Sequence, residues 1–187
     1  MNALDTFTSQ RTFRALLTAC AHPGRLVTLP DEVLTTRPAP LAVPLALADL
    51  GHRVAVVGTD SDRWGAHLTA ATSCPLVPAE HADLVVVLDG PTASLVGTLR
   101  RGSALAPEQG CRLVVACTLD GDGGVSLALR GPGVPSVTNV RVGGVPRDVF
   151  EALADANRGF PAGIDTFLVT EGGHVAALPR STTLEVH

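Results

Sequence analysis

An uninterrupted apolar run near the middle of the chain, ADLVVVLDG at residues 82–90, most constrains the fold. Its hydrophobic residues do not alternate with polar ones, as they would in a strand with one face in water. A strand of this kind is typical of a parallel sheet that helices cover on both faces. The run therefore predicts an α/β protein with a buried sheet.

Segments with strand and helix patterns alternate on both sides of this run. Alternation favours parallel strand pairs, whereas hairpin turns at DGDGG and TEGG favour antiparallel strands in the second half. We expect one domain spanning 1–187, with a mixed sheet and helices on both faces. The expected strands are 25–29, 53–59, 82–90, 112–119, 125–131, 138–144 and the two arms of a C-terminal hairpin, and the expected helices are 9–24, 44–50, 61–72, 91–102 and 146–159.

The first expected helix, SQRTFRALLTACAHPG, has an apolar stripe and defined ends. Its stripe, formed by Phe13, Leu16, Leu17 and Cys20, follows helical spacing, so we expect it to face the core. Thr8 or Ser9 is the expected N-cap, and His22-Pro23-Gly24 ends the helix because a residue before proline disfavours helical backbone.

Composition and charge exclude several classes of function. The net charge is −4 and only 3% of residues are aromatic, which argues against nucleic-acid binding. All fourteen basic residues are arginine, which rules out a lysine Schiff base and a lysine-dependent phosphate loop. Apolar runs too short for a membrane span and an N-terminus unlike a signal peptide predict a cytoplasmic protein. Cysteine and histidine spacing predicts no metal site.

Three loops contain short sequences that are found in binding sites, but each has a simpler structural interpretation. DGDGG, residues 120–124, lacks the downstream acid of a calcium loop and is expected to be a hairpin turn. GPGVPS, residues 131–136, is followed by proline and β-branched residues instead of the helix that a dinucleotide site needs. Asp89, at the end of the buried run, is expected to cap the following helix, although ligands also bind at such strand ends.

The segment LPRSTT near the C-terminus is the best candidate for a site. Arg180 can contact an anion with two nitrogens, and the hydroxyls of Ser181, Thr182 and Thr183 can donate hydrogen bonds. Alternatively, Arg180 pairs with a carboxylate inside the subunit or across an interface, and Asp165 on the other arm of the hairpin is one candidate partner.

Three stretches together resemble the PhnH family, the H subunit of the bacterial carbon–phosphorus lyase core complex. They are RTFRALLTACAHPG at 11–24, GSALAPEQGCRLVVA at 102–116, which contains Glu108, and FPAGIDTFLV with ALPRSTT at the C-terminus. Order and spacing match over essentially the whole chain. Ser181 stands where many relatives carry threonine, and a hydroxyl is kept.

The resemblance implies a fold like the large domain of pyridoxal-phosphate transferases, without that cofactor or any other. It also implies a homodimer that docks with the G, I and J subunits of the complex. The complex forms ribose 1-methylphosphonate 5-triphosphate from ATP and methylphosphonate. We expect an assembly or structural role without turnover by the chain alone. The alternatives are direct binding of a phosphate, nucleotide or phosphonate by Arg180, Ser181, Thr182 and Thr183 with Arg14, and a structural homodimer outside the pathway.

Overall fold

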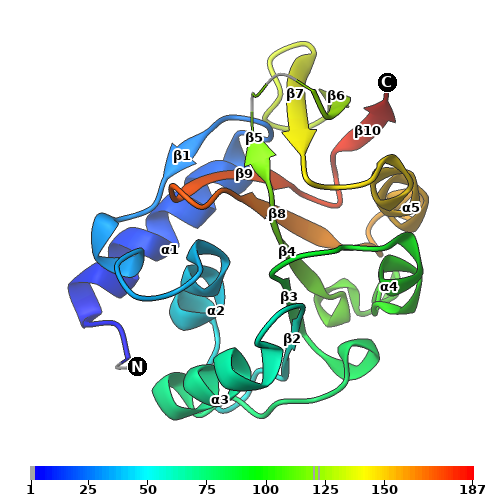
Figure 1. Cartoon of the computed structure of the whole chain (residues 1–187). Helices are drawn as coiled ribbons and strands as arrows, with labels where there is room; N and C mark the ends of the chain where they lie inside the picture. Colours follow the sequence, from blue (N-terminus) through cyan, green and yellow to red (C-terminus); the bar gives the residue numbers. More distant parts are fainter. Residues whose placement is uncertain (1–2, 120, 122) are drawn as a thin grey trace.

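The computed structural model describes residues 3–119, 121 and 123–187. A six-stranded sheet with strand order β1-β9-β8-β4-β3-β2 forms its centre, and a four-stranded sheet with order β10-β6-β7-β5 lies beside it (Figure 1). The α-helices are α1 (Thr6–Ala21), α2 (Ala42–Leu47), α3 (Ser61–Thr72), α4 (Ala93–Thr98) and α5 (Arg147–Asn157). The strands are β1 (Val27–Thr28), β2 (Val54–Val57), β3 (Leu84–Val87), β4 (Arg112–Ala116), β5 (Thr118–Leu119), β6 (Val125–Arg130), β7 (Thr138–Gly143), β8 (Asp165–Val169), β9 (His174–Leu178) and β10 (Thr183–Val186).

The sequence predicted a mixed central sheet and a buried strand within residues 82–90, and the structure confirms both. Strands β2, β3, β4 and β8 pair in parallel, and β9 and β1 continue the sheet antiparallel, so the sheet is mixed. All four residues of β3 are buried, as its uninterrupted apolar pattern requires. Short 3-10 turns, η1 (Asp31–Val33), η2 (Ala39–Leu41), η3 (Ala79–His81) and η4 (Pro107–Gln109), occur in the connections.

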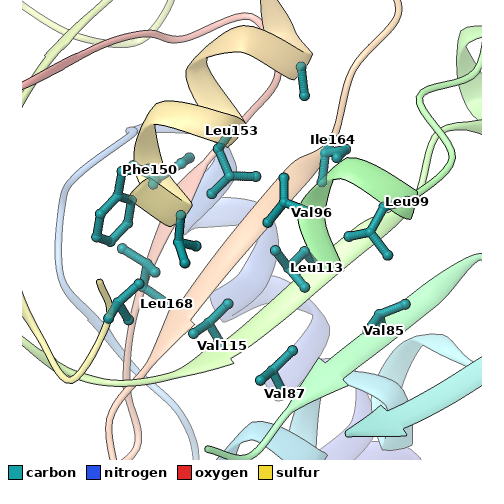
Figure 2. Packing of buried hydrophobic residues seen from close by; sticks show 14 of the residues in the cluster. Val85, Val87, Val96, Leu99, Leu113, Val115, Phe150, Leu153, Ile164 and Leu168 are labelled. Atoms are coloured by element: carbon teal, nitrogen blue, oxygen red, sulfur yellow. The ribbon is translucent and has the colours of Figure 1, made fainter. Parts of the chain in front are cut away.

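Each face of the central sheet has its own apolar core. Helices α1, α2 and α3 cover one face, where Leu16, Leu41 and Leu68 are fully buried. Helices α4 and α5 and the second sheet cover the other face. Figure 2 shows Phe150 and Leu153 of α5 packing with residues of α4 and of the sheet strands.

The second sheet corrects the expected hairpin around DGDGG. The strands before and after this turn, β5 and β6, do not pair with each other, because both pair antiparallel with β7. Residues 120 and 122 of the turn lie outside the described residues. Partner choice between antiparallel strands depends on the whole sheet, so the turn alone did not reveal it.

The GPGVPS segment connects β6 to β7, with no helix after it, as its sequence predicted. Gly133 has φ +78°, and a Cβ there would lie 2.2 Å from the carbonyl oxygen of Ala21. The glycine therefore lets this turn approach the end of α1 closely.

The first helix buries only part of the expected stripe, because Leu16 is buried and Cys20 partly buried whereas Phe13 and Leu17 are exposed. Its buried residues are Thr8, Thr12, Ala15, Leu16 and Ala19. Phe13 and Leu17 are instead 48% and 58% exposed.

Small side chains explain this choice, because they let α1 pack closely on α2 and β9. The Thr12 hydroxyl donates to the carbonyl oxygen of Thr8, so its burial leaves no unsatisfied group.

Two expected helix caps are also wrong. The N-cap of α1 is Asp5, whose carboxylate accepts hydrogen bonds from the backbone N–H groups of Phe7 and Thr8. The N-cap of α4 is Thr92. Asp89 instead accepts a hydrogen bond from the backbone N–H of Thr59, which follows β2.

Candidate functional site

Arg180 lies just after β9, beside the first residue of β8. Its Nη2 and Nε donate to Asp165 Oδ2 at 2.6 and 3.1 Å, and its backbone N–H donates to Asp165 Oδ1 at 2.9 Å. The Arg180 side chain is only 13% exposed. The intrasubunit ion pair that the hairpin suggested is therefore present.

The same guanidinium ties the hairpin to the loop before β4. Its Nη1 donates to the carbonyl oxygen of Pro107, at the start of η4. A Cβ at Gly110 would lie 2.6 Å from this Nη1, so glycine leaves the room that the guanidinium occupies. The guanidinium of Arg180 is therefore hydrogen-bonded within the subunit, to Asp165 and to the η4 loop.

The three hydroxyl residues after Arg180 line a cleft of about 340 Å³ beside α5. Ser181 is half-buried, Thr183 is exposed and Thr182 is buried. The Thr182 Oγ1 has no hydrogen-bond partner among the described residues. Arg158 of the same cleft has an exposed side chain that pairs with Asp155 at 3.3 Å.

Two other predicted site residues lie elsewhere. Glu108 is exposed in η4, and Arg180 contacts the carbonyl of the preceding residue rather than this carboxylate. Arg14 is exposed on α1 and does not line the cleft beside α5. The structure therefore joins Arg180, Asp165 and the hydroxyl segment, but it leaves Arg14 and Glu108 outside this group.

A charged cluster at the start of β3 was missed from the sequence. Asp83 accepts hydrogen bonds from Arg53 Nη2 at 2.7 Å, Arg53 Nε at 3.0 Å and Arg100 Nη1 at 2.6 Å. The hydrogen bonds from Arg53, followed by the two positive charges, lower the pKa of Asp83 to about 2. Three separate segments supply these residues, so no local pattern signalled the cluster.

A larger cavity, of about 930 Å³, was also missed. It lies at the carboxyl ends of β3, β4 and β8, and Arg37 from the proline-rich connection before η2 lines it. An arginine inside an otherwise apolar, proline-rich segment is the signal that could have found it.

All four cysteines are free thiols, and burial makes three of them poor nucleophiles. Burial raises the pKa of Cys20 to about 11 and those of Cys111 and Cys117 to about 12. Among the described residues, no group of three or more His, Cys, Asp or Glu side chains could hold a metal ion. No helix in the described part of the chain is long and apolar enough to span a membrane.

Comparison with known proteins gives consistent matches over nearly the whole chain. The family model described as bacterial phosphonate metabolism protein (PhnH) matches residues 3–185. The putative C-P lyase subunit protein HtxG of Stutzerimonas stutzeri is 33% identical over 184 residues, which cover 95% of this chain and 86% of that protein.

The second similar protein is the alpha-D-ribose 1-methylphosphonate 5-triphosphate synthase subunit PhnH of Rhizobium meliloti (strain 1021). It is 31% identical over 194 residues, which cover 96% of this chain and 91% of that protein. These matches agree with the family that the three sequence motifs indicated. The chain belongs to the PhnH family of bacterial phosphonate metabolism proteins.

Proposed function

We propose that the chain is a subunit of a carbon–phosphorus lyase complex in organophosphonate catabolism. In this role it supports formation of ribose 1-methylphosphonate 5-triphosphate from ATP and methylphosphonate, and it has no turnover of its own. The names of its two relatives support a subunit role. Its partners are a second copy of the chain and the G, I and J subunits, in the cytoplasm. Its fold follows the large domain of pyridoxal-phosphate transferases without the cofactor.

The exposed apolar face of α1 is the observation that carries this proposal. Phe13 and Leu17 protrude from the outer face of this helix, beside a cleft of about 310 Å³ that Cys20, Leu47 and Phe167 also line. Helix α1 lies on the outside of the molecule (Figure 1). Large apolar side chains beside a cleft are typical of a protein–protein contact. This face is where we place the contact with another subunit.

Co-purification with the genomic neighbours tests the subunit role. The tagged chain should bring down a large assembly that contains the G, I and J subunits. The double variant Phe13→Asp/Leu17→Asp should lose one or more partners, because a carboxylate in a buried apolar contact is strongly unfavourable. The change should be visible in the mass and composition of the purified material.

The control is Thr18→Asp, which places one exposed carboxylate in the last turn of α1, on a different side of the helix from Phe13 and Leu17. This variant should retain the whole assembly. Recovery of the bare chain from the wild type would contradict the subunit role. An unchanged assembly in the double variant would move the contact to another face.

Direct binding of an anion by the Arg180 segment is a second candidate function. The supporting observation is the buried Thr182 hydroxyl, which lacks a partner among the described residues and lines the cleft beside α5. Arg180 would then attract the anion while it keeps Asp165 and Pro107 as partners. Thr182→Val removes the hydroxyl with little change in volume, and it serves as a comparison variant in the titrations below.

A further inference from the structure

The cavity of about 930 Å³ lies where ligands of open α/β sheets commonly bind. Leu88 follows β3, Cys117 follows β4 and Thr170 follows β8, so three neighbouring parallel strands end at this cavity. Ligands of such sheets sit outside the carboxyl ends of the strands. The volume is within the range of small-molecule sites.

Arg37 places in the lining of this cavity a positively charged guanidinium that has no hydrogen-bonded partner among the described residues. Its side chain lines the cavity, yet its Nε and Nη1 are shielded from solvent and have no hydrogen-bond partner in the described part of the chain. Burial lowers the pKa of this guanidinium. Arg37 forms no ion pair with any described residue. Two of the three guanidinium nitrogens thus lack both solvent and a partner, which is costly, so an anion in the cavity would offset part of this cost.

The remaining lining combines a few polar groups with an apolar floor. Thr170 Oγ1 accepts a hydrogen bond from the backbone N–H of His174 at 3.0 Å, which leaves its hydroxyl proton available to a ligand. Thr118 adds a second, exposed hydroxyl. Glu171 also lines the cavity, but it is exposed. Leu88, with leucine, alanine and proline neighbours, can pack against the organic part of a ligand.

We propose that Arg37 and the hydroxyls of Thr118 and Thr170 bind the head of a small organic oxyanion in this cavity, with its apolar body on Leu88. The site itself follows from the cavity and from Arg37. The choice of a phosphonate head over a carboxylate rests on the proposed function in phosphonate catabolism.

Calorimetric titration of the full chain with phenylphosphonate, methylphosphonate, inorganic phosphate and benzoate tests the site. Phenylphosphonate should bind most tightly, because it combines a dianionic head with an apolar body. Arg37→Met should weaken its affinity by about tenfold to a hundredfold, the usual effect of losing a hydrogen bond to a charged group. Arg25→Ala, which removes an exposed arginine, should leave the affinity unchanged.

Thermal unfolding without ligand separates a binding role of Arg37 from a structural one. Arg37→Met removes a shielded charge and keeps most of the volume, so its Tm should equal or exceed that of the wild type. A marked fall in Tm would show that Arg37 has a structural partner and would overturn the proposal.

Binding of benzoate alone would leave the site in place and overturn the choice of a phosphonate head. Two other results of the titrations would overturn the site itself. They are absence of binding by every oxyanion in the series, and binding that Thr182→Val abolishes while Arg37→Met does not. This last result would place the bound anion in the cleft beside α5, next to Arg180. None of them bears on the subunit role, which co-purification tests separately.

Discussion

At the scale of single residues, Asp83 joins three parts of the chain through one carboxylate. Arg53 precedes β2 and Arg100 follows α4, and both donate to Asp83 at the start of β3. The Asp83 side chain is 24% exposed and that of Arg100 26%, so solvent screens the cluster only in part. Removing the carboxylate would leave two guanidinium groups close together without their shared partner.

Asp83→Asn should therefore lower the free energy of unfolding at pH 7 by about 1 kcal/mol, a value discounted for solvent screening. The folded pKa of about 2 lies below the unfolded value of about 3.9, so the ionised carboxylate stabilises the fold. This contribution is complete above about pH 5 and is lost progressively as the pH falls through the folded pKa of about 2. Urea unfolding at pH 7 and pH 2 measures the difference between the two proteins.

Glu151→Gln is the control, because Glu151 pairs with Arg147 on the exposed face of α5. Its effect should be much smaller, as is usual for an exposed pair. An equal loss of stability in Asp83→Asn at both pH values would show that the charge of Asp83 is not responsible.

The role of a single residue could be predicted where both members of an ion pair lie in one hairpin. Arg180 and Asp165 lie on the two arms of such a hairpin, and the residues alone suggested their pairing.

The role of Asp83 could not be predicted, because packing of several segments sets its surroundings. Arg37 stands out in its proline-rich segment, but the cavity that it lines is formed by other segments and could not be predicted. The prediction that Asp89 caps the next helix was wrong for the same reason. Its hydrogen-bond donor is the backbone N–H of Thr59, in the connection after the neighbouring strand β2.

At the scale of elements, the start of α1 depends on Asp5. Its carboxylate accepts hydrogen bonds of 3.0 Å from the N–H groups of Phe7 and Thr8, which have no partner inside the helix. Asp5→Ala should lower the free energy of unfolding by about 1 kcal/mol, a typical cost for losing an N-cap. Chemical denaturation at pH 7 measures this loss.

Ser9→Ala is the matched comparison, because Ser9 is one of the caps that the sequence suggested. It lies inside α1, where alanine favours the helix, so this variant should be neutral or slightly more stable. If Ser9→Ala lost stability and Asp5→Ala did not, Asp5 would not be the effective cap.

Helix and strand positions were largely predictable, but the faces they bury were not. Residues 61–72 form α3 as expected, and α5 buries Val149, Leu153 and Ala156 as its pattern required. For α1, Phe13 and Leu17 of the expected stripe face outward while Leu16 is buried, because the small side chains of this helix pack on α2 and β9. Hydrophobic periodicity marks an apolar face without showing whether the same subunit covers it.

At the scale of the whole molecule, the central sheet joins the two cores. Along β3, Leu84 and Val86 pack on the side of α1 to α3, whereas Val85 and Val87 pack on the side of α4 and α5. Strands β4 and β8 divide their residues in the same way. Since successive residues of a strand point to opposite faces, loss of these strands would disrupt both cores together.

Two buried thiols can test whether the chain unfolds as the one domain that its sequence predicts. Cys74 is buried in the core on the side of α3 and Cys111 in the opposite core, and both are fully inaccessible. Two variants, each keeping one of these cysteines with the others replaced by alanine, would be pulsed with iodoacetamide across a urea series. Mass spectrometry would measure the labelled fraction.

The two thiols should become reactive at the same urea concentration, once each variant's shift in overall stability is corrected from its circular dichroism curve. We expect this agreement because β3, β4 and β8 contribute residues to both cores, so neither core can stay packed once these strands unfold. Labelling of Cys111 well before Cys74 would mean that α4, α5 and the second sheet detach as a separate cooperative unit. The reverse order would assign that behaviour to α1, α2 and α3, and either order would divide the chain into two folding units.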